Sequence, residues 1–273
     1  MSKLYVVGTP IGNLEDFSPR AVRTLEECDF IAAEDTRVTL KLLNHFDIKK
    51  QMISYYEHNL REKGELIVSR IMAGESCALV TDAGMPAISD PGEDLVRLCH
   101  EHGVPVESVP GPCAFSTALA LSGMPSGRFT FEGFLSMNKP SRKEHLNSLV
   151  NEKRTMIFYE APHKIAQTLK DMNKTFGNRE IAIVREITKI HEEVIRTTLD
   201  EAVERYGETG LKGELVIIVH GKEEEAENEQ MTLEDAVEIA KSSVEKGMSV
   251  SEAAKSAAKL TGFKKGDIYK ALI

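Results

Sequence analysis

The sequence predicts an α/β protein with two domains followed by a small helical module. Its 273 residues are enough for two domains of ordinary size. Over residues 1–124 short apolar runs alternate with amphipathic segments, which is typical of a mostly parallel sheet covered by helices. After residue 125 some apolar runs follow one another too closely for a helix between them, which predicts a second, mixed sheet.

The first domain is expected over residues 1–124. Its strands are predicted at 4–7, 30–33, 52–55, 78–80 and 106–109, where the residues are mainly apolar. Apolar residues spaced three and four positions apart predict helices at 19–28, 38–45 and 95–102. Ser18 followed by Pro19 is a typical helix start.

The second domain is expected over residues 125–221, after a break at 123–127 that is rich in turn-forming residues. Its strands are predicted at 129–134, 155–159, 181–185, 194–198 and 215–219. The third and fourth of these have no room for a helix between them, so we expect them to pair antiparallel.

The C-terminal part is expected to be an acidic linker, residues 222–231, and a helical module, residues 232–273. The segment 221–231 holds five glutamates against one lysine and almost no apolar residue. Three helices are predicted at 232–246, 249–260 and 265–272, the first two with capping-box starts at Thr232 and Ser249. The turn at 261–263 resembles that of a helix-turn-helix.

Composition excludes several classes of protein. The net charge of −9 argues against a protein that coats nucleic acid, although a local basic patch is compatible with it. The four cysteines stand singly, and neither C-x-x-C nor H-E-x-x-H occurs, so we expect reduced thiols, a cytoplasmic location and no metal site. No run of about 18 apolar residues is present, so no membrane span is expected.

Three loops predict a ligand cleft. Residues 8–13, 81–92 and 110–114 are rich in glycine, proline and small polar residues, and each follows a strand of the first sheet. Such sheets bind ligands at the carboxyl ends of their strands. Glycine lets a ligand approach the backbone closely, and proline restricts the loop beforehand. The G-x-G-x-x-G, Walker and G-x-S-x-G motifs are missing, which argues against dehydrogenases, P-loop nucleotidases and serine hydrolases.

Ten short motifs occur in order over residues 4–221. They are VVGTPIGNLED at 6–16, AEDTR at 33–37, VTDAG at 80–84, ISDPG at 88–92, PGP at 110–112, SG at 122–123, FEGFL at 131–135, EAPHK at 160–164, REITK at 185–189 and KGEL at 212–215. In these motifs the chain resembles the ribosomal RNA small subunit methyltransferase I family. It departs from the family pattern at Met85, Ser136 and Lys164, and the lysine loses the two-pronged fork of an arginine.

The resemblance implies the two-domain tetrapyrrole-methylase fold, a homodimer and S-adenosylmethionine bound between the domains. It also implies 2′-O-methylation of a cytidine ribose in 16S rRNA, and therefore the 30S ribosomal subunit as partner. The residues expected to hold the cofactor are Pro10, Asp82, Ala83, Gly84, Ile88, Pro110, Gly111, Ala114, Ala118, Tyr159, Gly213 and Leu215.

Asp35, Arg37 and His58 are the candidate catalytic residues, because they follow the second and third strands. Methyl transfer needs mainly an in-line alignment of the reacting atoms, so a dedicated base is not mandatory. Arg37 has the geometry to hold a phosphate. Two structural roles stay open: Asp35 as a helix cap and His58 as a surface side chain.

RNA is expected to contact lysines and arginines at three places. Lys139 precedes Arg142 and Lys143 in a predicted proline-containing loop, and residues 249–273 hold five lysines against two acids. Lysine and arginine contacts to phosphates would add salt-sensitive affinity, whereas a solvated helical face is the alternative. The candidate RNA-binding residues are Arg142, Lys143, Lys164, Lys255, Lys259, Lys264 and Lys265.

Two other functions stay open. One is a tetrapyrrole methyltransferase of the precorrin type, although a small macrocycle needs no lysine-rich helical module. The other is a non-catalytic RNA-binding or ribosome-assembly factor, which binding of S-adenosylmethionine would exclude.

Overall fold

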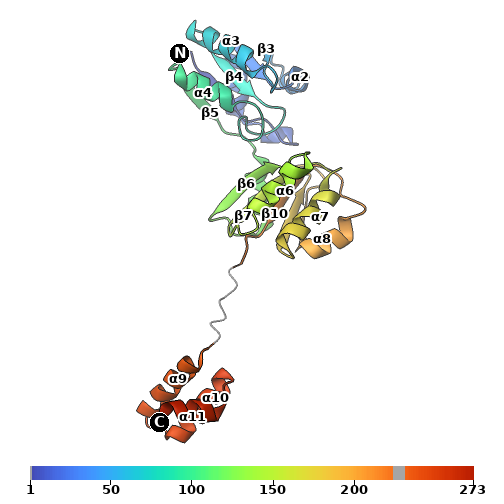
Figure 1. Ribbon diagram of the computed structural model, residues 1–273. Coiled ribbons are helices and arrows are strands. Elements are labelled where there is room, and N and C mark those ends of the chain that lie inside the picture. The colour runs from blue at the N-terminus through green and yellow to red at the C-terminus, as the bar shows by residue number, and fades with distance from the viewer. Residues whose placement is uncertain (1, 224–230) are drawn as a thin grey trace. The chain divides into compact units, whose positions relative to one another are not determined.

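The computed structural model describes residues 2–223 and 231–273 (Figure 1). The chain divides into two compact units, residues 1–222 and 223–273. Most of the predicted acidic linker, residues 222–231, lies outside the described residues. Among the helices that are described, each is too short or too polar to span a bilayer.

The first sheet is parallel throughout and confirms the predicted architecture. Its strand order is β3-β2-β4-β1-β5. Strand β3 begins one residue earlier than predicted, and the other four agree within a residue. The strands are β1 (Leu4–Val7), β2 (Phe30–Ala33), β3 (Gln51–Ser54), β4 (Cys77–Val80) and β5 (Val106–Val109). Of the three inner strands, β2 and β4 are buried along their whole length, as expected for a sheet covered on both faces.

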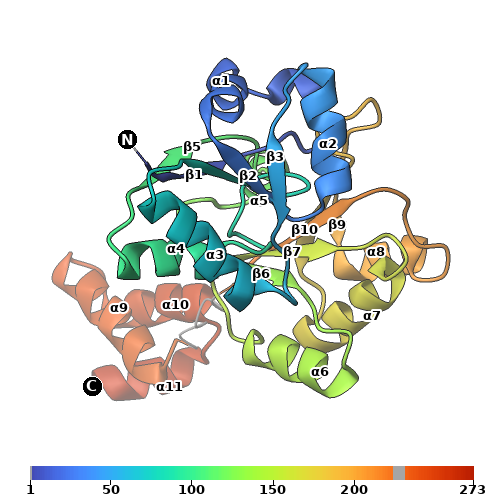
Figure 2. The same cartoon turned by 90° about the horizontal axis from the view of Figure 1, so that it is seen from above.

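Helices cover both faces of this sheet. Helices α1 (Pro19–Glu27) and α2 (Thr36–His45) share one apolar core with it, and α3 (Leu60–Met72) and α4 (Glu93–Glu101) share the other. Figure 2 shows α3 and α4 side by side. The predicted start of α1 is confirmed, since the Ser18 hydroxyl accepts a hydrogen bond from the Ala21 N–H. Helix α3 was not predicted, and Gly64, a poor helix former, lies within it. A short 3-10 turn, η1 (Leu14–Asp16), precedes α1.

The second sheet is mixed, as predicted, with strand order β6-β7-β10-β8-β9. Strands β6 and β7 are parallel, and the other three pairs are antiparallel. The antiparallel pairing expected between the third and fourth strands is that of β8 with β9. The strands are β6 (Phe129–Phe134), β7 (Thr155–Glu160), β8 (Glu180–Arg185), β9 (Glu193–Thr198) and β10 (Leu215–Val219).

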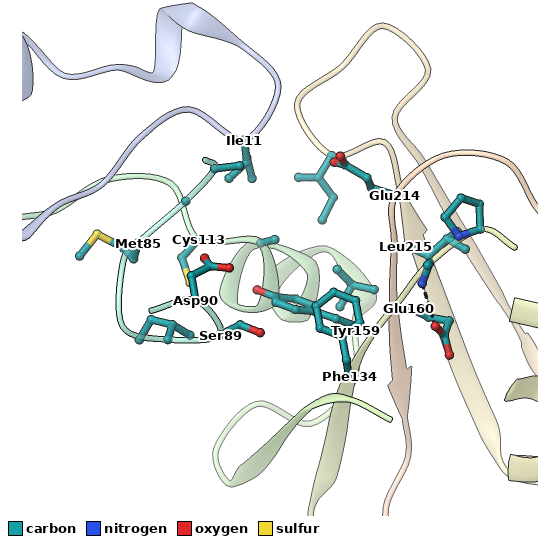
Figure 3. A pocket seen from close by; sticks show the side chains of 18 residues that line it. Ile11, Met85, Ser89, Asp90, Cys113, Phe134, Tyr159, Glu160, Glu214 and Leu215 are labelled. Atoms are coloured by element: carbon teal, nitrogen blue, oxygen red, sulfur yellow. Dashed lines mark hydrogen bonds between the residues drawn. The ribbon is translucent and has the colours of Figure 1, made fainter. Parts of the chain in front are cut away.

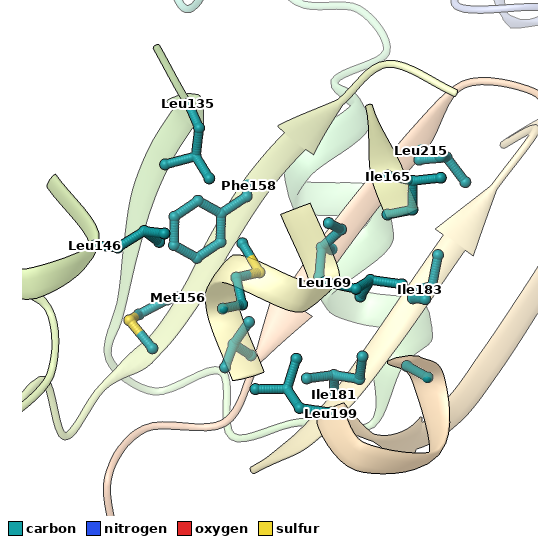
Figure 4. Close-up of a cluster of buried hydrophobic side chains, with 14 of the residues drawn as sticks. Leu135, Leu146, Met156, Phe158, Ile165, Leu169, Ile181, Ile183, Leu199 and Leu215 are labelled. Carbon is teal, nitrogen blue, oxygen red and sulfur yellow. The ribbon is translucent and has the colours of Figure 1, made fainter. Parts of the chain in front are cut away.

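The two faces of the second sheet are covered by different helices. Helices α6 (Lys139–Ser148), α7 (Ile165–Phe176) and α8 (Leu199–Tyr206) enclose the core shown in Figure 4. Helix α5 (Ala114–Ser122) packs on the opposite face, where Ala118 and Leu119 join the buried residues of β7, β8 and β10. The predicted boundary near residue 124 assigned α5 to the first domain. Its apolar side chains instead place it on the second sheet.

The C-terminal unit contains the three predicted helices, α9 (Leu233–Glu245), α10 (Val250–Thr261) and α11 (Lys265–Leu272). Its core consists largely of alanines with Ile268. The capping box at Thr232 is confirmed, and the Ser249 hydroxyl accepts a hydrogen bond from the Glu252 N–H. Helix α10 ends at Gly262, whose φ of 76° lies in the left-handed region that glycine tolerates.

Candidate active site

The three glycine- and proline-rich loops converge at the carboxyl edge of the first sheet. Thr9 and Gly84 form an isolated antiparallel bridge, with N···O distances of 2.9 and 3.1 Å. Gly8 packs directly on the third loop, because a Cβ atom on Gly8 would lie 2.7 Å from the Gly111 Cα and N atoms. No side chain fits at that distance. The predicted convergence of the loops is therefore confirmed.

A cavity of about 330 Å³ lies between these loops and the second sheet (Figure 3). Ligand sites in proteins measure roughly 300–1,000 Å³. Its wall on the side of the first sheet comes from the loops, and its opposite wall comes from α5 and the ends of β6, β7 and β10. The lining residues are Ile11, Ala83, Gly84, Met85, Ile88, Ser89, Asp90, Cys113, Ala114, Phe134, Tyr159, Glu160, Ala161, Pro162, Ile187, Glu214, Leu215 and Val216.

Half of the predicted cofactor residues line this cavity, namely Ala83, Gly84, Ile88, Ala114, Tyr159 and Leu215. The others, Pro10, Asp82, Pro110, Gly111, Ala118 and Gly213, are not among the lining residues. Ala118 is fully buried in the core between α5 and the second sheet. Gly111 shapes the third loop from outside the cavity. Gly213 has the same kind of role, because a Cβ atom there would lie 2.6 Å from Glu186 Cγ.

The backbone of the loop over residues 81–92 is strained in a way that shapes the cavity. Gly84 has a φ of 90°, and a Cβ atom on it would approach Ile11 Cγ2 at 3.4 Å and the Pro112 carbonyl oxygen at 3.6 Å. A side chain would therefore fill the space between the loops. Ala87 has a φ of 64°, a conformation that costs about 1–3 kcal/mol outside glycine and that occurs often at functional sites.

Tyr159 and Glu160 end β7 on the opposite side of the cavity. The Tyr159 hydroxyl oxygen accepts a hydrogen bond from the Phe115 N–H at 3.1 Å. Burial raises the pKa of Tyr159 to about 12, so its phenol is neutral at physiological pH. The Glu160 carboxylate turns away from the cavity (Figure 3), accepting hydrogen bonds from the Ala161 N–H at 2.8 Å and from the Thr168 hydroxyl. Glu160 therefore supports the wall and does not face a ligand.

The loop after β8 closes another side of the cavity. The Glu186 carboxylate accepts a hydrogen bond from the Glu214 N–H at 2.9 Å. Lys189 Nζ lies 3.1 Å from the Glu186 carboxylate and 3.0 Å from the Glu214 carboxylate. The loop that follows β1 rests on this group, because a Cβ atom on Gly12 would lie 2.7 Å from Lys189 Cγ. These contacts fix Ile187 and Glu214 in the lining. Neither residue was among the predicted site residues; Ile187 follows β8, and Glu214 directly precedes β10.

Three carboxylates gather around Thr81 beside the cavity. The Thr81 hydroxyl donates a hydrogen bond to Glu34 Oε2 at 2.6 Å and also interacts with Asp90. Because a hydroxyl has one hydrogen, it can donate to only one of these two carboxylates at a time. Burial, followed by the negative charge of Glu34, raises the pKa of both Asp82 and Asp90. Asp90 is half-buried and its carboxylate points into the cavity (Figure 3). It can accept a proton or face a cation, a role that its position in a proline-containing turn did not reveal.

Comparisons with known proteins agree with this arrangement. The family model of the Tetrapyrrole (Corrin/Porphyrin) Methylases matches residues 3–203. The Ribosomal RNA small subunit methyltransferase I of Halalkalibacterium halodurans is 47% identical over 268 residues, which are 97% of this chain and 93% of the relative. The protein of the same name from Thermotoga maritima is 45% identical over 223 residues, which are 82% of this chain and 100% of the relative. This chain belongs to the ribosomal RNA small subunit methyltransferase I family.

Solved structures show that the family shares the tetrapyrrole-methylase fold. One is a Uroporphyrin-III C-methyl transferase from Thermus thermophilus in complex with S-adenyl homocysteine, with a TM-score of 0.55 and 20% identity. The match covers 80% of this chain and 97% of that protein. Another is the methyltransferase CobJ, with a TM-score of 0.60 and 18% identity over 81% of this chain and 95% of that protein.

The three candidate catalytic residues of this family member lie away from the cavity lining. Asp35 caps α2, where it accepts a hydrogen bond from the Arg37 N–H at 2.8 Å and pairs with the Arg37 guanidinium at 2.6 Å. These hydrogen bonds lower the pKa of Asp35 to about 2. The Arg37 side chain is 88% exposed, and His58 is exposed in the turn before α3. The alternative of a helix cap is therefore confirmed for Asp35.

Arg142 is not in an exposed loop, contrary to the prediction for the segment from Lys139 to Lys143. These residues begin α6, with Asn138 as the cap and Pro140 in the first turn, a position that proline favours. The Arg142 side chain turns inward, with Nε 2.7 Å from Asp171 Oδ2 and Nη2 2.8 Å from Thr168 Oγ1. A buried guanidinium with these partners supports α7 and is not available to a phosphate.

The other candidate RNA-binding residues are accessible. Lys143 is exposed on α6, and Lys164 is half-buried at the start of α7. In the C-terminal unit, the candidates Lys255 and Lys259 of α10, Lys264 at the cap of α11 and Lys265 of α11 are exposed. Lys265 donates to the Ser251 hydroxyl at 3.0 Å, which joins the two helices. Within the part of the chain that the structure describes, no group of three His, Cys, Asp or Glu side chains could hold a metal ion.

Proposed function

We propose that this chain transfers a methyl group from S-adenosylmethionine to the ribose 2′-hydroxyl of a cytidine in 16S rRNA. The observation that carries the proposal is the cavity enclosed by the three loops, in a chain of this family. Its relatives are named for the small-subunit ribosomal RNA, and a protein of the same fold was crystallised with S-adenyl homocysteine. The alternatives of a precorrin-type methylase and a non-catalytic factor gain no support from these relatives.

The residues of the cavity suit this cofactor. When bound, S-adenosylmethionine supplies an electrophilic methyl group on a positively charged sulfur. Ala83 and Gly84 present backbone and no large side chain, and Leu215 offers an apolar surface on the opposite wall. Asp90 gives the cavity a negative charge, which favours a cationic ligand in a partly dehydrated site.

Asp90 is also the group that we propose takes the proton of the hydroxyl. Burial and the negative charge of Glu34 raise the pKa of its carboxyl, which makes it a stronger base than an exposed aspartate. Asp35 and His58 lack this position, because neither lines the cavity. Asp35 is moreover engaged by Arg37.

The exposed lysines of α10 and α11 are proposed to bind rRNA phosphates. Residues 249–273 contain five lysines and two acids, so this part of an acidic chain carries a local positive charge. The whole T. maritima relative corresponds to 82% of this chain, so about a fifth has no counterpart there. The unit of residues 223–273 has that size. We therefore assign it to docking and not to the methyl transfer, and we expect the enzyme to work as a homodimer.

Transfer of tritium from labelled S-adenosylmethionine to 30S subunits that lack this methylation tests the proposal. Nuclease mapping should find the label on one cytidine ribose. Label on a base would show that the proposed 2′-O-methylation is wrong, and the assignment to the family would still hold. If equilibrium dialysis detected no binding of S-adenosylmethionine, the proposal of a methyltransferase would be wrong, and a non-catalytic RNA-binding factor would be the better interpretation.

A further inference from the structure

A β-bulge in β6 decides which face of the second sheet Phe134 occupies. Successive side chains of a strand point to opposite faces, so Phe131 and Phe134 would lie on opposite sides of a regular strand. In β6 the register shifts between Phe131 and Gly133, so that Phe131 pairs with Ile157 and Phe134 pairs with Tyr159. Because Ile157 and Tyr159 share a face, the extra residue brings Phe134 to the same face as Phe131.

The bulge is held by its own backbone and by a contact behind the sheet. Gly133 has a φ of 64°, in the left-handed region, and no atom lies within 4 Å of a Cβ atom placed on it. Glycine is therefore needed for the conformation and not for space. On the other face Glu132 Oε2 lies 2.8 Å from His145 Nε2 of α6, and Leu135 enters the core beneath α6 and α7. Bulges beside active sites commonly redirect a side chain in this way.

The redirected phenylalanine lies at the cavity with much of its ring uncovered. Phe134 lines the cavity and yet is 56% exposed. Its ring contacts the Tyr159 ring, with centroids 5.4 Å apart and planes tilted by 60°. Tyr159 is fixed in turn by Phe131, at 5.0 Å, and by the Phe115 N–H. Phe134 is thus a positioned aromatic ring whose remaining surface is available to a ligand (Figure 3).

We propose that this ring stacks on the unstacked base of the target nucleotide. The inference rests on the proposed function: to bring its 2′-hydroxyl into the cavity, the target nucleotide has to turn out of the RNA, which unstacks its base. Proteins hold such bases by stacking them on aromatic side chains. Phe134 stands on the wall of the second sheet and Asp90 on the loop wall of the first (Figure 3). The base would then be held on one wall of the cavity, while Asp90 lines the other wall.

The test compares Phe134→Ala, Phe134→Leu and Phe134→Trp with the unchanged protein. The KM for unmethylated 30S subunits should rise on the order of tenfold or more in Phe134→Ala, the effect typical of removing one stacking partner from a base. Phe134→Leu keeps an apolar side chain without an aromatic face and should show most of this rise. Phe134→Trp keeps an aromatic face and should have a KM close to that of the unchanged protein. The Kd for S-adenosylhomocysteine, measured by equilibrium dialysis, should change much less than the KM in every variant.

Two results would overturn the inference. An unchanged KM in Phe134→Ala would show that no base stacks there. A weaker Kd for S-adenosylhomocysteine, parallel to the change in KM, would assign the ring to the adenine of the cofactor. Both results require that the unchanged protein methylates 30S subunits, so failure of the proposed function is recognised separately, by the absence of transfer in that control.

Discussion

The two walls of the cavity are built in different ways. The wall on the first sheet consists of loops whose backbones touch, as at Gly8 with Gly111 and at Thr9 with Gly84. The wall on the second sheet consists of side chains, such as Phe134 and Tyr159, that strand register and hydrogen bonds hold in place. At Gly8 and Gly111 the first wall leaves no room for an added methyl group, whereas the second depends on which side chains are present. Substitutions should therefore have different consequences on the two sides.

The largest effect is expected for Gly111→Ala in the first wall. The new Cβ atom would lie 2.8 Å from Gly8 Cα and 2.9 Å from the carbonyl carbon and oxygen of Gly8. These are backbone atoms, which cannot rotate away. Forcing a methyl group into such a site costs about 1–3 kcal/mol and separates the loops. We expect binding of S-adenosylhomocysteine to be abolished in equilibrium dialysis. Gly127→Ala is the control, because nothing lies within 4 Å of its Cβ position. Wild-type binding by Gly111→Ala would show that the close packing of the loops is not needed.

Asp90→Asn, in the same wall, should lower the activity while it raises the stability of the protein. We expect kcat to fall about 100-fold or more, as is usual when a general base is removed. Burial raises the folded-state pKa of Asp90, so its ionised form weakens the folded protein as pH rises through that pKa. The asparagine does not ionise, and the variant should be the more stable protein at pH 7.

Urea unfolding at two pH values measures this effect. The stability difference between Asp90→Asn and the unchanged protein should be largest at neutral pH. It should shrink as pH falls through the raised pKa of the folded state and disappear below the ordinary aspartate pKa of about 4, where the carboxyl is protonated in both states. A variant that is less stable at neutral pH would contradict the environment assigned to Asp90.

Two neighbouring residues of α6, Arg142 and Lys143, are expected to differ in role: the first stabilises the fold and the second contacts RNA. Arg142→Met should lower the free energy of unfolding by about 1–3 kcal/mol, because Thr168 and Asp171 would be left without this partner. Lys143→Met, one residue further, is exposed and should change stability by less than about 0.5 kcal/mol. Denaturation measures both, and 30S binding at several salt concentrations should reveal an RNA contact only for Lys143. A salt effect at Arg142 with unchanged stability would reverse the assignment.

The smallest effect is expected outside the cavity, in the C-terminal unit. Replacing both Lys255 and Lys259 by alanine should weaken 30S binding at low salt. It should also reduce the slope of log K against log salt by about 0.7 for each phosphate that the protein no longer neutralises. The matched control replaces Lys241 of α9 and Lys246 at its C-cap by alanine, which removes the same charge from a part of the unit outside residues 249–273. The kcat should stay unchanged in both, and a lower kcat would mean that the module takes part in the transfer.

The sequence predicted part of each wall: Ala83, Gly84 and Ile88 line the loop wall, and Ala114, Tyr159 and Leu215 line the opposite wall. The three loops were recognisable because glycine and proline set local backbone conformations, and Gly84 and Tyr159 were placed in the cavity. Asp90 was overlooked because its motif is equally typical of a turn. Asp35 and Arg37 were selected for following a strand, and the structure shows them paired with each other on the helix that begins there.

By itself the sequence determined the order of the strands, the helix starts at Ser18, Thr232 and Ser249, and the loops at the edge of the first sheet. These depend on periodicity and on conformational preferences that act over a few residues. Only the tertiary structure decided that α5 packs on the second sheet, that Arg142 is buried and that the bulge at Gly133 turns Phe134 to the cavity. Each of these depends on interactions between residues far apart in the chain, whose energies no local pattern contains.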